Sequence, residues 1–66
     1  MNITLNGESC ELVDGTTLVA FIESRTGSTR GSAVVVDDEV VPRGTWPDYL
    51  LRDGQRVELI TAVQGG

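Results

Sequence analysis

The residue pattern with the clearest chemical potential is the end of the chain, Gln64-Gly65-Gly66. A free α-carboxyl group is ionised at neutral pH and is therefore an oxygen nucleophile. Attack of the Gly66 carboxylate on the α-phosphate of ATP would give an acyl-adenylate, and a sulfur nucleophile could convert that anhydride into a thiocarboxylate. The two glycines would let such a tail enter a narrow channel. The simpler interpretation is a frayed chain end, since termini are often poorly ordered.

Other sources of catalytic chemistry are scarce. The chain has no histidine, which removes any Ser-His or Cys-His nucleophile pair. Its one cysteine, Cys10, cannot form an internal disulfide, and no ligand spacing around it predicts a metal site. We favour a buried thiol that packs as a small hydrophobic side chain over a sulfur relay. At 66 residues the chain has little room for a core and a cleft together, so a carrier or binding module is expected, with no catalytic residues of its own.

Charge restricts the partners. The formal net charge is −5, from five arginines, no lysine and ten acidic residues. Phosphate-binding surfaces need clustered Lys and Arg, so nucleic acid and anionic membranes are poor partners, and a basic surface on another protein is a good one. No apolar run approaches the roughly 20 residues of a membrane span, and the start of the chain lacks a signal-peptide pattern. We therefore expect a soluble protein of the cytoplasm.

The elements that must position the tail begin with a hairpin. Residues 1–5 alternate apolar and polar side chains, which is typical of a half-buried strand. Asn6-Gly7 is a strong two-residue hairpin signal, and a return strand is expected over residues 8–13. A short helix is predicted over 18–24, because Leu18, Phe21 and Ile22 have the i, i+3, i+4 spacing of one buried face. Thr16 or Thr17 could cap it, although neither has Glu or Gln three residues on. The polar run 25–32 is expected to be a loop.

The second half of the chain predicts three more strands. Residues 33–36 form a continuous apolar run of the kind found in a central strand, followed by a turn at 37–39. Val40-Val41 starts a short return strand that Pro42 ends, and residues 44–51 connect it to a turn at Asp53-Gly54. The last strand is expected over 56–63, with Val57, Leu59, Thr61 and Val63 on its inward face. One mixed sheet with one helix across it satisfies every apolar face, giving a single α+β domain over 1–63 and a tail over 64–66.

This order of elements, with its diglycine end, resembles the ubiquitin-like β-grasp proteins. The closer resemblance is to the sulfur carrier proteins of thiamin (thiazole) biosynthesis, the ThiS family. It covers the whole chain and is most specific from residue 34 onward. The segments that carry it are Val41-Pro42-Arg43 followed by Trp46, Asp53-Gly54 before the final strand, and Thr61-Ala62-Val63-Gln64-Gly65-Gly66 at the end.

The resemblance implies a β-grasp fold with a mixed sheet of about four to five strands, one main helix and a flexible tail. It implies that a ThiF-type adenylyltransferase activates Gly66 with ATP, that a cysteine desulfurase persulfide supplies sulfur, and that thiazole synthase (ThiG-type) accepts it. The chain would then be a co-substrate that binds no cofactor itself, monomeric when free. Rival functions are sulfur delivery for molybdopterin or cysteine synthesis, protein modification through Gly66, and a plain interaction module.

Four further features have open roles. Trp46 is expected to pack in the small core, with a partner-binding anchor as the alternative. Arg43 is either solvated or pairs with an acidic group near the tail or on a partner. Ile60 and Ala62 are predicted to face outward beside the tail as a docking surface. The remaining feature is an acidic set, interpreted as a solvated surface that also suits a basic partner: Asp37, Asp38, Glu39, Asp48, Asp53 and Glu58.

Overall fold

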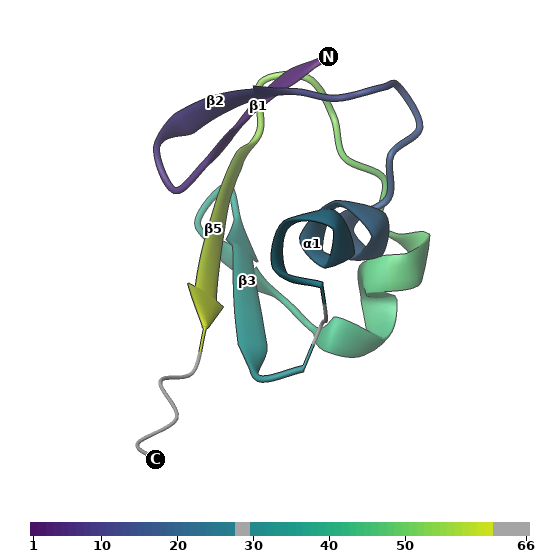
Figure 1. Ribbon diagram of the computed structural model, residues 1–66, viewed down its shortest axis with the longest axis vertical. Coiled ribbons are helices and arrows are strands. Elements are labelled where there is room, and N and C mark those ends of the chain that lie inside the picture. The colour runs from purple at the N-terminus through teal and green to yellow at the C-terminus, as the bar shows by residue number, and fades with distance from the viewer. Residues whose placement is uncertain (28–29, 62–66) are drawn as a thin grey trace.

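The computed structural model describes residues 1–27 and 30–61, and within them the chain forms one mixed sheet with helices on one side (Figure 1). The spatial order of the strands is β2-β1-β5-β3-β4. This order and the helix across the sheet confirm the predicted α+β, β-grasp architecture. The elements are β1 (Asn2–Leu5), β2 (Glu8–Glu11), α1 (Leu18–Thr26), β3 (Ser32–Val36), β4 (Glu39–Val41), the 3₁₀ helix η1 (Arg43–Asp48) and β5 (Arg56–Thr61).

Two tight hairpins build the outer parts of the sheet. Strands β1 and β2 are antiparallel, and Asn6 and Gly7 between them have φ values of 50° and 87°. Strands β3 and β4 are also antiparallel, and Asp37 and Asp38 have φ values of 49° and 70°. Two-residue loops with positive φ at both positions match the right-handed twist of the strands they join. The first turn was predicted from its Asn-Gly sequence, and the second lies within the predicted turn at 37–39.

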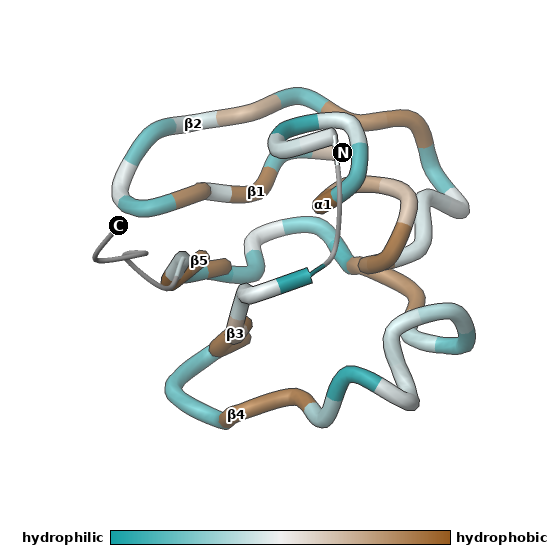
Figure 2. Tube along the Cα trace, turned by 60° about the horizontal axis from the view of Figure 1, so that its bottom comes forward, coloured by the Kyte–Doolittle hydropathy of each residue, from teal (hydrophilic) through white to brown (hydrophobic). Residues whose placement is uncertain are grey.

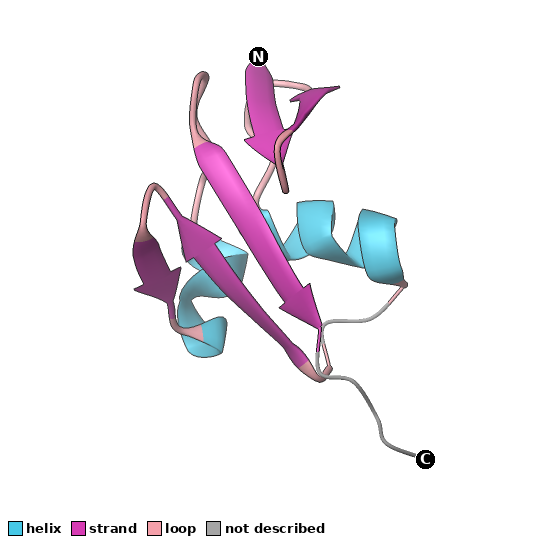
Figure 3. Cartoon of the chain, turned by 90° about the vertical axis from the view of Figure 1, so that its left-hand side faces the viewer, coloured by secondary structure: helices cyan, strands magenta, loops and turns pink. Residues whose placement is uncertain are grey.

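Strand β5 runs through the middle of the sheet (Figure 3), parallel to β1 and antiparallel to β3. A parallel neighbour cannot be reached by a tight turn, and the intervening chain must cross over one face of the sheet. Helix α1, the β3–β4 hairpin and η1 make up that connection. Strand β5 is thereby held between two neighbouring strands in the middle of the sheet.

Helix α1 has a clear beginning and end. The Thr17 hydroxyl accepts a hydrogen bond from the backbone N–H of Ala20 at 3.2 Å, so Thr17 is the N-cap and Thr16 is not. Gly27 has φ of 77° and donates its N–H to the Glu23 carbonyl at 2.8 Å, a left-handed ending that favours glycine. The helix therefore runs two residues beyond the predicted 18–24, because Gly27 is the first residue that can end it in this way.

The core lies between the inner face of the sheet and α1 with η1. Trp46 is 1% exposed and donates its indole N–H to the Val41 carbonyl at 2.9 Å. Its predicted packing role is confirmed, and the alternative of a docking anchor is wrong because the ring is not accessible to a partner. The other buried side chains come from every layer: Ile3, Leu18, Phe21, Ile22, Val34, Val36, Val41, Leu51 and Val57.

Two further boundaries differ from the sequence-based expectation. Strand β2 ends at Glu11 and not at Val13, because the Val13 carbonyl turns to accept hydrogen bonds from Thr16, at 3.2 Å from its backbone N–H and 2.6 Å from its hydroxyl. The stretch 44–51, expected to be a plain connection, contains most of η1. Trp46 explains this compact form, because its ring fills the core while the surrounding backbone crosses the end of the sheet.

Candidate functional site

The base of the C-terminal segment is the end of β5. Its residues pair with β3 in register, Ile60 opposite Ala33 and Thr61 opposite Ser32. The predicted alternation along this strand is confirmed for Val57, which is buried, and for Ile60, which is 56% exposed. Thr61 was predicted on the inward face but is exposed. Figure 1 shows the end of β5 extending below α1.

The predicted reactive group and its tail lie outside the described residues. This applies to Gly66, to Gly65 and Gln64, which were predicted to enter a channel, and to Ala62. Those predictions therefore stay predictions. The structure does place the strand from which the tail continues.

Beside this strand, apolar side chains gather on the outer face of the sheet. Ala33 lies opposite Ile60, and Val35 lies opposite Val40. Val40 is 71% exposed, Ala33 is also exposed, and Val35 is half-buried. We call Ala33, Val35, Val40 and Ile60 the outer apolar patch. Figure 2 shows the matching hydrophobic segments on β3, β4 and β5.

Only Ile60 of this patch was predicted to be exposed. Residues 33–36 are all apolar, so their pattern does not reveal which of them face outward. In the structure Val34 and Val36 are buried, and the two residues that alternate with them belong to the outer apolar patch. Successive strand residues point to opposite faces of a sheet, so counting back from the hairpin turn would have assigned Ala33 and Val35 to the outer face.

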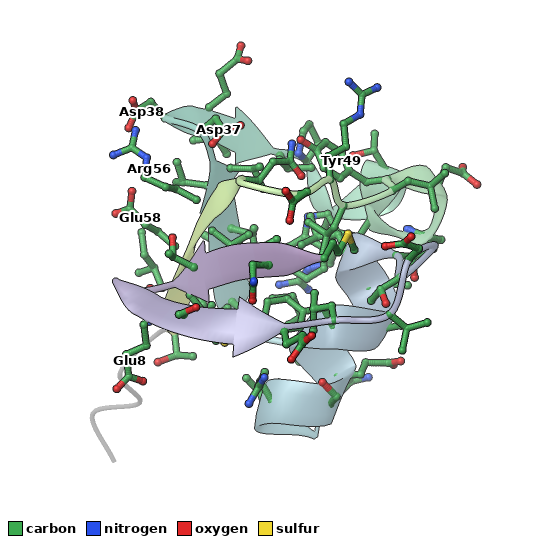
Figure 4. The ribbon with its side chains drawn as sticks, turned by 90° about the horizontal axis from the view of Figure 1, so that it is seen from above. Glu8, Asp37, Asp38, Tyr49, Arg56 and Glu58 are labelled. Carbon is green, nitrogen blue, oxygen red and sulfur yellow. The ribbon has the colours of Figure 1, made fainter. Side chains whose placement is uncertain are left out.

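Acidic side chains border the patch. Glu58 lies opposite Val35 on the same face, and Asp38 forms an ion pair with Arg56 at 2.8 Å. The Asp37 carboxylate accepts the backbone N–H of Arg56 at 2.9 Å. Figure 4 shows Asp38, Arg56 and Glu58 following one another along one side of the molecule. We call Asp38 and Glu58, both exposed, the acidic rim; Glu39 is also exposed, but it lies opposite the buried Val36 and so belongs to the other face of the sheet.

The acidic set is therefore more than a solvated surface. Asp37 holds the start of β5, and Asp53 accepts the backbone N–H of Asn2 at 2.6 Å, which ties the turn before β5 to β1. Both side chains remain exposed. A carboxylate that accepts a backbone N–H satisfies a donor at a strand end, so these two residues support the fold directly.

Arg43 contacts a backbone carbonyl and an aromatic ring, an arrangement that neither prediction included. Its guanidinium donates to the Ser32 carbonyl at 2.9 Å and lies 5.6 Å from the centre of the Trp46 ring. Among residues 1–27 and 30–61, no carboxylate lies within ion-pair distance of it. It is exposed, but it is not simply solvated. Arg43 therefore connects η1 to Ser32, the residue of β3 that pairs with Thr61 at the end of β5.

Cys10 is half-buried and packs against the core, in agreement with the preferred hydrophobic role. Its thiol lies 3.7 Å from the Glu8 carbonyl oxygen. In the described part of the chain, no cluster of three or more metal-ligating side chains occurs. Nor is any helix there long and apolar enough to cross a membrane.

Comparison with known proteins agrees with this architecture. The chain is 38% identical over 64 residues to the sulfur carrier protein ThiS of Thermus thermophilus, covering 97% of this chain and 98% of that protein. It is 26% identical over 66 residues to the sulfur carrier protein ThiS of Escherichia coli K12, covering all of both chains. A crystal structure of a thiamine biosynthesis protein (ThiS) from Geobacter metallireducens shares the fold over both whole chains, with a TM-score of 0.83 at 22% identity.

The family model described as "ThiS family" matches residues 3–66. The match includes the segments on which the resemblance was based, the Val-Pro-Arg segment with Trp46 and the terminal diglycine. With the fold already established, the conclusion is direct: this chain belongs to the ThiS family.

Proposed function

We propose that this protein is the sulfur carrier of thiamin thiazole biosynthesis and that the Gly66 carboxylate is its working group. Family membership over residues 3–66 is the observation that carries the proposal. Both curated relatives described above are named sulfur carrier proteins. The protein acts as a co-substrate whose chemistry is performed in the active sites of partner enzymes. Because the first step consumes ATP, we place the protein in the cytoplasm.

The proposed cycle has three steps. In the first, the Gly66 carboxylate attacks the α-phosphate of ATP in a ThiF-type adenylyltransferase, forming an acyl-adenylate and releasing pyrophosphate. In the second, the terminal sulfur of a persulfide displaces AMP, and a thiol reduces the resulting S–S bond to leave the thiocarboxylate. In the third, thiazole synthase transfers this sulfur to its substrate in exchange for an oxygen atom, which restores the carboxylate. The terminal glycines keep the tail narrow enough to reach each enzyme's reacting atoms.

The outer apolar patch supports the docking part of the proposal. A contiguous exposed apolar surface with a polar border is typical of a protein interface, whereas single exposed apolar residues are common everywhere. The patch includes Ile60, on the strand that continues into the tail. A partner that covers it therefore receives the tail beside the interface. Ile60 was predicted to contact a partner, and the rest of the outer apolar patch extends that surface. Arg43 is a weaker docking candidate, because its guanidinium already donates to the Ser32 carbonyl.

The acidic rim indicates what borders the complementary surface. Asp38 lies in the turn between β3 and β4, and Glu58 lies on β5. The matching surface on the adenylyltransferase should have an apolar centre with cationic residues around it, since complementary charge guides encounter and fixes orientation.

The proposal is tested with the full chain and its adenylyltransferase in an ATP–pyrophosphate exchange assay. The wild-type chain should support exchange. When a sulfur donor is added, the mass of the protein should increase by the difference between one sulfur and one oxygen atom, which marks the C-terminal thiocarboxylate. Deleting Gly66 keeps a carboxylate but withdraws it by about 3.3–3.6 Å, one extended residue. Because a displacement of about 1 Å can cost a hundredfold, exchange should fall by at least about that factor. Undiminished exchange by the deletion variant would rule out the carrier function.

A second assay separates the end uses. The thiocarboxylate form should donate its sulfur to thiazole synthase and should not serve molybdopterin or cysteine synthesis in parallel assays. The protein-modifier alternative predicts isopeptide bonds from Gly66 to lysines of other proteins, because this chain has no lysine of its own. Tryptic mass spectrometry of cell extracts would detect such bonds, and we expect none.

A further inference from the structure

Strand β1 is shorter than the strand it supports. Its register with β5 pairs Thr4 with Arg56 and Leu5 with Val57, and it stops there because the chain turns at Asn6. The Asn6 backbone N–H still reaches the Val57 carbonyl at 2.9 Å. Beyond Val57, the side of β5 that faces β1 has no further strand residue beside it within the described chain.

The Asn6 side chain occupies the next pairing position. Its Oδ1 accepts the Leu59 backbone N–H at 2.9 Å, and its Nδ2 donates to the Leu59 carbonyl at 3.3 Å. A primary amide presents the same acceptor and donor as a peptide group. Asn6 therefore continues the ladder with its side chain after its backbone has entered the turn.

The turn makes this contact available at little cost. Asn6 has φ of 50°, a left-handed conformation in which asparagine is several-fold enriched among non-glycine residues. The same conformation closes the β1–β2 hairpin. One residue thus serves two purposes, and the second purpose requires an amide of this length, which glycine cannot supply.

We propose that Asn6 is a positioning residue for the reaction of the tail, an inference that rests on the proposed function. It fixes Leu59, the residue directly before Ile60 of the outer apolar patch, and so holds the end of β5 from the side opposite β3. Without it, β5 beyond Val57 is held by β3 alone. The docking surface and the start of the reactive tail then lose a common support, and binding to the adenylyltransferase requires that support to be re-formed.

Three variants of the full chain isolate this role. Asn6→Gly accepts the positive φ of the turn but removes both side-chain hydrogen bonds. Asn6→Asp keeps an acceptor for the Leu59 N–H and loses the donor to the Leu59 carbonyl. Thr17→Ala is the matched control, because it removes the cap of α1 far from β5 and lowers stability without touching Leu59.

Amide hydrogen exchange measured by NMR reads out the contact directly. In Asn6→Gly the Leu59 amide should exchange about five- to thirtyfold faster than in Thr17→Ala, in keeping with the loss of one or two hydrogen bonds. In pyrophosphate exchange, corrected for the folded fraction, KM should rise about three- to tenfold while kcat changes less than about twofold, since the defect precedes chemistry. Asn6→Asp should give intermediate values in both assays.

Each other outcome has a definite meaning. Equal Leu59 exchange rates in Asn6→Gly and Thr17→Ala would show that the amide contact does not hold the strand, and the proposal would fall. An unchanged KM in Asn6→Gly, with the wild-type chain active, would refute the positioning role while leaving the carrier function intact. A wild-type chain that supports no pyrophosphate exchange at all would overturn the carrier function and the positioning role with it.

Discussion

The β1–β2 and β3–β4 hairpins are closed by turns of the same kind, yet their outer faces carry different side chains. In the first hairpin Thr4 lies opposite Ser9 and Asn2 opposite Glu11, so that face is polar. In the second, Val35 lies opposite Val40, and Ala33 continues the apolar face toward Ile60 of β5. The inner faces of both hairpins contribute to one core.

This difference separates the needs of folding from those of docking. The inner residues must be apolar in both halves because they cover the same helix. The outer residues of β3, β4 and β5 have no such requirement, and the polar first hairpin shows that the sheet tolerates polar side chains there. Apolar residues concentrated on the half that continues into the tail are therefore best explained by a partner.

The largest expected effect is on the core that both halves share. Replacing Trp46 with alanine should lower the free energy of unfolding by about 3–5 kcal/mol, because it leaves a large cavity and removes the hydrogen bond to Val41. Thermal denaturation measures the loss, and Trp46→Phe should be milder. Adenylation per folded molecule should stay near the wild-type value. An unchanged melting temperature would contradict the core role of Trp46.

The next effect distinguishes the two outer faces. Val40→Asp places a charge in the outer apolar patch and should weaken binding to the adenylyltransferase by about thirtyfold, roughly 2 kcal/mol. Thr4→Asp places the same charge on the polar half and should change binding by less than about twofold. Both are measured by calorimetry, with melting curves as controls for folding. Equal losses from the two variants would remove the distinction between the halves.

A smaller effect concerns the acidic rim. Raising ionic strength from about 0.05 M to about 0.5 M should slow association with the adenylyltransferase by about fivefold or more, because exposed charges are screened beyond about 10 Å at 0.1 M salt. The dissociation rate should change less. Stopped-flow fluorescence gives both rates. An association rate independent of salt would show that the acidic rim does not guide docking.

The smallest effect compares the two turns. Asp38→Asn removes an exposed ion pair with Arg56, in which the two side chains are 74% and 61% exposed, and such pairs contribute about 0.2–1 kcal/mol. Asparagine suits the φ of 70° well, so we expect a net change within about 0.5 kcal/mol. Asp38→Ala should cost about 1–2 kcal/mol, because alanine is strained there. Urea denaturation resolves the two. If both variants were equally stable, the turn conformation would not limit stability.

Much of the fold was accessible from residue patterns. Alternation over 1–5 with Asn6-Gly7 predicted the first hairpin, and the spacing of Leu18, Phe21 and Ile22 predicted a helix whose buried side is formed by those residues. The end of α1 and the form of η1 were missed. Both depend on a single residue whose role appears only in three dimensions, Gly27 as a left-handed terminator and Trp46 as a core side chain that draws its own backbone into a turn.

The candidate site divides in the same way. The diglycine end with the Val-Pro-Arg segment and Trp46 was enough to predict the family, because those residues are local in sequence. The outer apolar patch was not predictable as a surface, since its members come from three strands. In addition, residues 33–36 are all apolar, so the sequence does not show which of them face outward. The contact of Arg43 with the Ser32 carbonyl on β3 was likewise not predictable, because the two residues are eleven positions apart in the sequence.

By itself the sequence determined the order of the elements, the first turn and the core-facing side of α1, because each of these follows from residue type and short-range spacing. The reactive role of Gly66 is a prediction from the same residue patterns. Tertiary structure alone decided that β5 lies between β1 and β3, that three strands share one apolar outer face, and that the Asn6 amide takes the place of a missing strand residue beside Leu59. The reason is physical: backbone groups of a central strand must find hydrogen-bond partners on both sides, and which residues supply them depends on where distant segments end.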